Sequence, residues 1–318
     1  MRKLLPLFLP ILLIGASCNS KKDSAPAQAA AVDDAIIGRW DLTVEKEGRK
    51  VPSWLEVKLS GRKTLVGYFV ADGGSARPIS KVTYQGGKVN FSIPPQWEDS
   101  DKDMVFNGEL KDGKLSGTIL SSLGKTEPFT GEKAPSLVRD KAPGWGAPIN
   151  LLNGKDLKGW HPEKGKSQWV FENGVLRSDK PGTNLITDSA FNDFKLHIEF
   201  RYPKGSNSGV YLRGRYEVQV QDDRGLPPSN VHFGGVYGFL TPNQMAALEP
   251  GEWQSFDITL VGRVVTVVAN GKNVIVEQII PGITGGALDS REGEPGPIML
   301  QGDHGPVEYR NIVLTPAR

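Results

Sequence analysis

The sequence is poor in cysteine, in net charge and in long apolar runs, and each shortage narrows what the chain can be. One cysteine in 318 residues cannot support an internal disulfide framework. The 38 basic and 36 acidic residues give a formal net charge of +2, which provides no electrostatic basis for binding nucleic acid. No long stretch keeps helical spacing, whereas 38 glycines and 23 prolines are typical of short strands joined by turns. We therefore expect an all-β protein whose partner is neutral, such as a carbohydrate.

The first 34 residues resemble an export signal and a tether. Arg2 and Lys3 precede the apolar run Leu4 to Ile14, which is too short for a convincing membrane span. Small residues then lead to Cys18, in the position of the acylated cysteine of a bacterial lipoprotein. We predict a signal peptide over 1–17 and a lipidated Cys18 with a flexible tether over 18–34. The anchor would attach an exported protein to the outer membrane, on its periplasmic or cell-surface side. An ordinary cleaved signal with an incidental cysteine is the alternative.

Residues 35–133 are predicted to form a small up-and-down β-barrel. Glycine-rich turns separate eight short candidate strands, and closure into a barrel removes exposed sheet edges. The candidate strands are 39–45, 54–60, 64–70, 76–84, 88–93, 104–110, 114–120 and 125–131. The opening Gly38-Arg39-Trp40 resembles the Gly-x-Trp start of lipocalin-like barrels. We assign this domain no site and regard it as a carbohydrate-binding or spacer module. The proline-rich segment 134–148 is the predicted linker, and 149–318 the second domain.

Polar side chains gather on one face of the predicted strands between residues 194 and 223. Apolar residues alternate along 195–202, resume at 210–212 and return at 218–220, so the intervening residues point the other way. Successive antiparallel strands would place the polar residues on one shared surface. Its expected members are Glu199, Arg201, Tyr211, Arg213, Glu217, Gln219 and Gln221. Such side chains bind hydroxyl-rich ligands and stack on rings. The alternative is the ordinary solvated side of an antiparallel sheet.

Eight short motifs of the second domain, in order along the chain, carry a family resemblance. Among them are LLNGKDLKGW at 151–160, WVFENGVL at 169–176, NSGVYLRGRYEVQV at 207–220, GVYG at 235–238 and LQGDHGPVEYRNI at 300–312. Together they resemble the 3-keto-disaccharide hydrolase family. The resemblance implies a concanavalin A-like jelly-roll sandwich with a sugar-binding groove on its concave sheet. We therefore expect an all-β chain in which a barrel is followed by this sandwich.

The resemblance also implies the chemistry. A ketone at C3 of a glycoside acidifies the hydrogen at C2, so that a base can remove it and the enolate can expel the group at C1; addition of water completes a net hydrolysis. We assign Glu217 and His304 as base and acid candidates and Arg213 as the positive charge for the oxyanion. The expected substrate-binding residues are Asn207, Tyr211, Gln219, Asp222, Tyr237, Gln301 and Arg310.

Two other functions fit the same residues. Glu217 with Glu199 or Asp222 could act as the paired carboxylates of an ordinary glycosidase, or the protein could be a glycan-binding surface lipoprotein without activity. We expect no cofactor and no metal site. Calcium or another divalent ion is a minor alternative, because the aspartates and histidines near Asp222 and Asp303 have no fixed ligand spacing. The sequence leaves the oligomeric state open.

Overall fold

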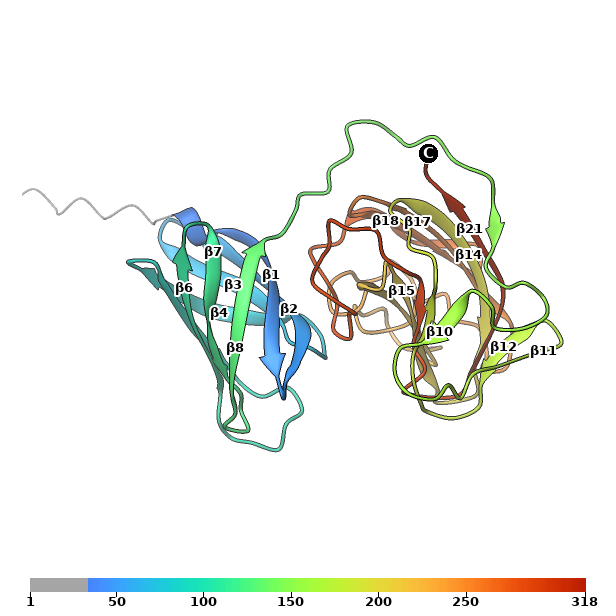
Figure 1. Cartoon of the computed structure of the whole chain (residues 1–318), viewed down its shortest axis with the longest axis horizontal. Coiled ribbons are helices and arrows are strands. Elements are labelled where there is room, and N and C mark those ends of the chain that lie inside the picture. Colours follow the sequence, from blue (N-terminus) through green and yellow to red (C-terminus); the bar gives the residue numbers. More distant parts are fainter. Residues whose placement is uncertain (1–33) are drawn as a thin grey trace, which may run out of the picture. The chain divides into compact units, whose positions relative to one another are not determined.

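The structure is a computed structural model that describes residues 34–318, and it is almost entirely β (Figure 1). The predicted signal peptide and the predicted lipid attachment at Cys18 lie outside the described residues. A short 3-10 helix, Asp34–Ile36, precedes the first strand. The predicted fold class, a barrel followed by a two-sheet sandwich, is confirmed. No helix of the described part is long and apolar enough to cross a membrane.

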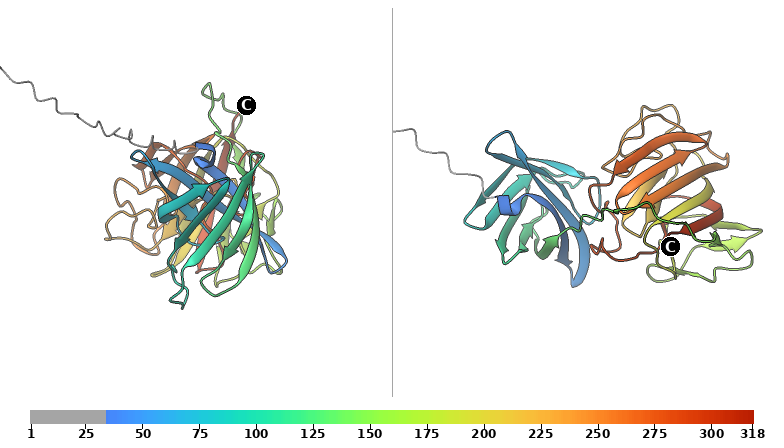
Figure 2. Two further views of the ribbon diagram at one scale, coloured as in Figure 1. Left: turned by 90° about the vertical axis from the view of Figure 1, so that its left-hand side faces the viewer. Right: turned by 90° about the horizontal axis from the view of Figure 1, so that it is seen from above.

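Eight antiparallel strands form a closed barrel in simple chain order, and Figure 2 shows how they curve round until β8 lies beside β1. The strands are β1 (Gly38–Lys46), β2 (Arg49–Ser60), β3 (Thr64–Val70), β4 (Arg77–Gln85), β5 (Lys88–Ile93), β6 (Met104–Lys111), β7 (Lys114–Leu120) and β8 (Thr126–Lys133). Their tight turns follow from local chemistry. Asp112 and Gly113, for example, both have positive φ, which a two-residue hairpin of this hand requires.

The second half of the chain forms two antiparallel sheets. The smaller sheet has the order β10 (Trp160–Pro162), β13 (Leu185–Thr187), β20 (Met299–Leu300), β15 (Asn207–Leu212) and β16 (Tyr216–Gln221). The larger has the order β11 (Val170–Glu172), β12 (Val175–Ser178), β21 (Val307–Pro316), β14 (Phe194–Arg201), β17 (Gln254–Val261), β18 (Val264–Ala269) and β19 (Lys272–Ile279), with β9 (Ile149–Asn150) paired to β21. β14, β17, β18 and β21 lie side by side in Figure 1.

The sandwich core lies between these sheets. Val218 and Val220 of β16 are fully buried, as are Ile198 and Phe200 of β14, because alternate residues of each strand turn inward. No named strand lies in 134–148, and the predicted domain boundaries remain predictions. This linker is nevertheless fixed, since the Arg139 guanidinium forms a 2.6 Å ion pair with a largely buried carboxylate, that of Asp193.

Candidate functional site

The hairpin of β15 and β16 carries the predicted polar face. Its register pairs Asn207 with Gln221, Gly209 with Gln219 and Tyr211 with Glu217. All six therefore share one face of the smaller sheet, while the residues between them face the core. The strand alternation placed four of these residues on this face, namely Tyr211, Glu217, Gln219 and Gln221.

Glu217 is the chemical centre of this face. Its side chain is buried, and the Tyr211 hydroxyl lies 2.9 Å from its Oε2. The same hydroxyl lies 2.9 Å from the backbone oxygen of Gly285. Burial raises the pKa of Glu217 from its ordinary 4.5 to about 8, although the Tyr211 hydrogen bond and the nearby His304 lower it. Glu217 is thus mostly protonated at neutral pH and can give up a proton.

An aspartate–histidine pair approaches Glu217 from the segment that follows β20. The Nδ1 of His304 and the Oδ1 of Asp303 are 2.6 Å apart. This hydrogen bond, more than any other effect, raises the pKa of His304, and the charge of Glu217 adds to the rise. About half of the His304 side chain is exposed, so the imidazole can meet a ligand from solvent. The predicted grouping of Glu217 with His304 is consistent with this electrostatic coupling.

Two carboxamides line the same face. Gln301 follows β20, and its backbone N–H donates to the carbonyl of Gly209 in β15. The Oε1 atoms of Gln219 and Gln301 are buried, and neither has a hydrogen-bond partner among the residues that the structure describes. A buried acceptor without a partner is costly in a protein interior. A ligand hydroxyl that donates to these oxygens would remove that cost.

Tyr237 of the GVYG motif lies beside Glu217. Its backbone N–H donates to the carbonyl of Glu217, and Val236 bridges Val218, so this segment covers the free edge of β16. Burial, together with the charge of Glu217, raises the pKa of Tyr237. The Tyr237 hydroxyl therefore stays protonated at neutral pH and can act as a donor.

The structure corrects the expected role of Arg213. The alternation that placed its side chain beside Tyr211 ends at Leu212, because Arg213 and Gly214 form a turn with φ of 54° and 65°. The guanidinium is instead buried on the opposite side of the hairpin, where it donates to the Tyr216 hydroxyl and the Gly262 carbonyl. Arg213 cannot supply positive charge to an oxyanion beside Glu217 from that position.

The sequence prediction also placed Arg310 and Glu199 incorrectly, at the same site as Glu217. Both belong to the larger sheet, where the Nε of Arg310 lies 2.6 Å from the Oε2 of Glu199 and its guanidinium covers the Trp253 ring. Arg201 belongs to β14 of that sheet as well. The expected single surface is therefore wrong, since the chain passes from one sheet to the other between β14 and β15.

Two further predicted residues form hydrogen bonds at the open end of the β15–β16 hairpin. The Asn207 amide donates to the Oε1 of Gln221 at 2.8 Å, on the same face as Glu217 but at the far end of the hairpin. The carboxylate of Asp222 accepts a hydrogen bond from the backbone of Gly205 and so stabilises a turn. We keep Asn207 as a residue of the ligand face and regard Asp222 as structural.

The sequence analysis did not identify Asp303 as the hydrogen-bond partner of His304. It also did not show that Gly209, which has no side chain, leaves room for the side chain of Glu217. A Cβ atom on Gly209 would lie 2.2 Å from the Oε1 of Glu217. The adjacent Asp303-His304 dipeptide was a signal in the sequence for the pair. The role of Gly209 became visible only once the register of β15 and β16 was known. Within residues 34–318 no group of three or more histidine, cysteine, aspartate or glutamate residues is arranged to hold a metal ion.

Comparison with known proteins places residues 147–315 in a family. Residues 147–315, just over half of the chain, match the family described as the 3-keto-alpha-glucoside-1,2-lyase-like domain. A curated 3-keto-disaccharide hydrolase of Bacteroides thetaiotaomicron is 29% identical over 89 residues, which are 24% of this chain and only 30% of that protein.

Solved structures of two candidate glycosyl hydrolases from Parabacteroides distasonis are similar as well. One is 33% identical, with a TM-score of 0.47 over 52% of this chain and 82% of its own. The other is 20% identical, with a TM-score of 0.44 over 54% of this chain and 94% of its own. The family therefore rests on the sequence match over 147–315. On that match, this chain belongs to the family of 3-keto-alpha-glucoside-1,2-lyase-like domains.

Proposed function

We propose that the chain cleaves the glycosidic bond of 3-keto-glycosides by elimination at C1 and C2, followed by addition of water. The observation that carries the proposal is Glu217, a buried carboxyl group that stays protonated near neutrality beside an imidazole oriented by an aspartate. A proton donor and a proton acceptor with such separate roles are what an elimination requires.

In the first half of the reaction, His304 acts as the base. With Asp303 accepting the Nδ1 proton, Nε2 takes the proton from C2 of the sugar, and the electron pair of that bond forms the enolate of the C3 ketone. The enolate then collapses to a double bond between C1 and C2. The leaving oxygen departs with the electron pair of the C1–O bond and receives the proton of Glu217.

In the second half the roles reverse. The carboxylate of Glu217 takes a proton from water, whose hydroxide adds to C1. The imidazolium of His304 exchanges its proton with solvent, because about half of the side chain is exposed, and then donates a solvent-derived proton to C2. Both groups regain their starting states, and the sum of the two halves is hydrolysis. If the unsaturated product leaves before water adds, the same site acts as a lyase.

The enolate oxygen needs donors, and Arg213 does not provide them. We assign this role to the Tyr237 hydroxyl and the side-chain amide of Gln301, which share the face with Glu217. Preorganised donors of this kind stabilise a developing oxyanion because they need no reorientation during the reaction.

The test is incubation of the full chain with a 3-keto-glucoside and the matching unoxidised glucoside in deuterated water. We expect cleavage of the keto substrate alone, with deuterium at C2 of the sugar detected by mass spectrometry. Product incubated without protein controls for spontaneous exchange at C2. Equal cleavage of both substrates, or product without deuterium beyond the control, would rule out the elimination route.

Two alternatives predict other outcomes. A two-carboxylate glycosidase would need a second acid near Glu217, but Glu199 lies in the other sheet and Asp222 stabilises a turn. A glycan-binding protein without activity would bind unoxidised polysaccharide and consume no substrate over long incubation. We also keep the lipid anchor as a proposal; a Cys18→Ser variant should release the protein from the membrane fraction.

A further inference from the structure

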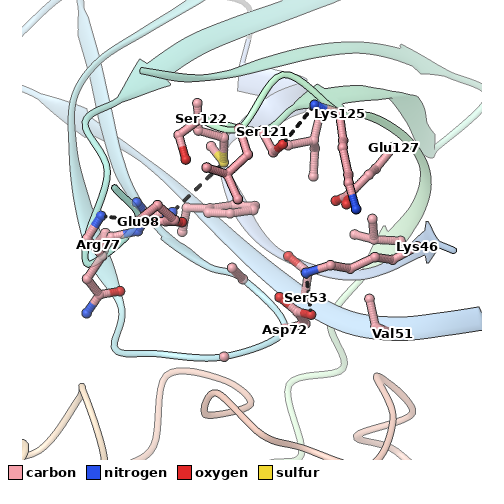
Figure 3. Close-up of a pocket in the computed structure, with 18 of the residues that line it drawn as sticks. Lys46, Val51, Ser53, Asp72, Arg77, Glu98, Ser121, Ser122, Lys125 and Glu127 are labelled. Atoms are coloured by element: carbon pink, nitrogen blue, oxygen red, sulfur yellow. Dashed lines mark hydrogen bonds and ion pairs between the residues drawn. The ribbon is translucent and has the colours of Figure 1, made fainter. Parts of the chain in front are cut away.

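The barrel contains a cavity that the proposed reaction does not use. Eight strands leave an interior that side chains can fill or that can hold one small ligand. In one part of this barrel the rings of Phe91 and Phe106 stack with their centroids 4.6 Å apart, and the ring of Phe129 lies tilted against that of Phe106 at 4.4 Å, so aromatic side chains occupy the interior. Beyond Phe69 the interior opens into a cavity of about 260 Å³ (Figure 3).

A loop from β5 to β6, residues 94–103, is held over this cavity by side-chain hydrogen bonds. The Gln96 amide donates to the Ser75 hydroxyl at 2.9 Å, the Ser100 hydroxyl donates to the Ser122 carbonyl at 2.7 Å, and Arg77 donates to the Pro94 carbonyl at 2.9 Å. These bonds connect the loop to two other segments of the barrel, one at Ser75 and Arg77 and one at Ser122. The rim of the cavity is therefore held in a defined conformation by these hydrogen bonds.

That loop presents a tryptophan. Trp97 lines the cavity and is 63% exposed, which is unusual for the largest apolar side chain. Its ring edge lies against Gly74, where an added Cβ would come within 2.1 Å of the indole. Gly74 has a φ of 83°, so both its backbone and its missing side chain allow the ring to lie there. The exposed indole is held in place and is not merely a loose surface residue.

The charges around the cavity balance. Three cationic and three anionic side chains line it: Lys46, Arg77 and Lys125 against Asp72, Glu98 and Glu127. Figure 3 shows Arg77 and Glu98 at one side, with Lys46, Lys125 and Glu127 at the other. Lys46 pairs with Asp72 at 2.8 Å, and Lys125 pairs with Glu47. Each lysine thus already has a carboxylate partner, so the cavity has no excess of cations for a fatty acid or another anion.

We propose that this cavity binds one neutral sugar ring, stacked on Trp97, at a site separate from Glu217. A pyranose has an apolar C–H face that suits an indole, and apolar residues such as Val51 and Met104 form part of the wall. Its hydroxyl groups both donate and accept hydrogen bonds. The carboxylates of the cavity can accept hydrogen bonds from these hydroxyl groups, and its ammonium and guanidinium groups can donate hydrogen bonds to them. The volume suits a single ring rather than an extended chain.

The experiment measures binding of methyl α-glucopyranoside to the full chain by isothermal titration calorimetry. The Trp97→Ala variant is compared with Tyr68→Ala, a matched control that removes another exposed aromatic ring of the barrel, outside the cavity. A Glu217→Gln background alters the sandwich site, which helps to separate binding there from binding in the barrel. We expect Trp97→Ala to weaken binding at least tenfold and Tyr68→Ala to change it less than twofold.

A second variant, Val51→Phe, tests the cavity without altering Trp97, because the larger ring fills the space. It should also weaken binding at least tenfold with an unchanged melting temperature. In the Glu217-containing protein, Trp97→Ala should cleave a small 3-keto-glucoside within twofold of the parent rate. Unchanged sugar affinity in both variants, binding of decanoate in place of the sugar, or loss of cleavage with Trp97→Ala would each overturn the separate sugar site. Failure of the proposed reaction alone would leave the binding result intact.

Discussion

The Tyr211 hydroxyl lies 2.9 Å from both the Oε2 of Glu217 and the backbone oxygen of Gly285. A hydroxyl has one proton, so it can donate to only one of these acceptors. When Glu217 is protonated, its own proton can point at the Tyr211 oxygen, and Tyr211 then donates to Gly285. When Glu217 is ionised, Tyr211 turns to the carboxylate. The pair therefore has a hydrogen-bond arrangement for each protonation state that the proposed reaction needs.

A Tyr211→Phe substitution should move the alkaline limb of the activity profile. The hydroxyl lowers the pKa of Glu217, so its removal raises that pKa further and shifts the limb to higher pH. We expect a lower maximal rate as well, because the ionised state loses a donor. Tyr216→Phe is the matched control, since Tyr216 is a buried tyrosine of the same hairpin that donates to Glu292 on the opposite face. An alkaline limb that stays in place with Tyr211→Phe would contradict the role of this hydroxyl.

A Glu217→Gln substitution should lower the rate of cleavage about 10² to 10⁴-fold, because the amide keeps the shape but has no proton to transfer. The same substitution should also change how the stability of the protein depends on pH. The folded-state pKa of Glu217 is raised, so the parent protein loses stability as the pH rises from about 4.5 to about 8, by at most about 1.4 kcal/mol per pH unit.

The amide cannot ionise, so Glu217→Gln should lose less stability than the parent between pH 5 and pH 8. Urea unfolding at these two pH values measures the difference. Parallel losses in the two proteins would show that Glu217 ionises freely in the folded state.

The activity should have a bell-shaped pH profile. His304 must be neutral to act as the base, and its pKa is raised, so activity should rise with pH through a value above the ordinary 6.5. Glu217 must be protonated to act as the acid, so activity should fall again near pH 8. Initial rates of cleavage of a 3-keto-glucoside from pH 5 to pH 10 measure both limbs. A profile that keeps rising above pH 9 would exclude Glu217 as the acid.

An Asp303→Asn substitution should shift mainly the acidic limb, because Asp303 has the largest effect on the pKa of His304 and only a small one on the pKa of Glu217. The hydrogen bond that His304 donates to the Asp303 carboxylate is the main cause of the raised pKa of His304, so its loss moves that limb to lower pH and reduces the rate. The control is Asp257→Asn, which alters an aspartate–histidine pair of similar geometry, 2.7 Å from His197, in the larger sheet. The control should leave the profile unchanged. Equal shifts in the two variants would argue for a general charge effect.

The sequence predicted correctly that Tyr211, Glu217, Gln219 and Gln221 share one face, because alternation within a hairpin is fixed locally. A short turn over residues 213–215 joins β15 to β16, so residue parity puts Tyr211 and Glu217 on the same face, and the register of the hairpin pairs them. The barrel followed from alternation and turn residues, whereas the two-sheet sandwich was implied by the family resemblance. His304 depended on the family resemblance, because no local pattern shows that a loop after residue 300 returns to this hairpin.

The errors have physical causes that a single sequence does not contain. Alternation gives the face of a strand but not the sheet to which it belongs, so Glu199 was grouped with Glu217 although β14 pairs with β17 and β21. Parity also fails at residues with positive φ, and Arg213 is such a residue. The unpaired oxygens of Gln219 and Gln301 depend on packing between distant segments and were visible only in three dimensions.

A Gly209→Ala substitution tests whether the position of Glu217, and not only its chemistry, matters. The added Cβ would lie 2.2 Å from the Oε1 of Glu217, far inside van der Waals contact, so the carboxyl group must leave its position beside Tyr211. Overpacking of this kind costs about 1–3 kcal/mol of stability. Displacement of a reacting group by about 1 Å can cost about 10² in rate.

Gly144→Ala is the control, because a Cβ there meets nothing within 4 Å. We expect the Gly209 variant to stay folded by circular dichroism, to lose activity and to give an alkaline limb away from pH 8. Cleavage at the parent rate in a folded Gly209→Ala protein would mean that Glu217 need not lie against Tyr211, and the proposed acid would have to be another group.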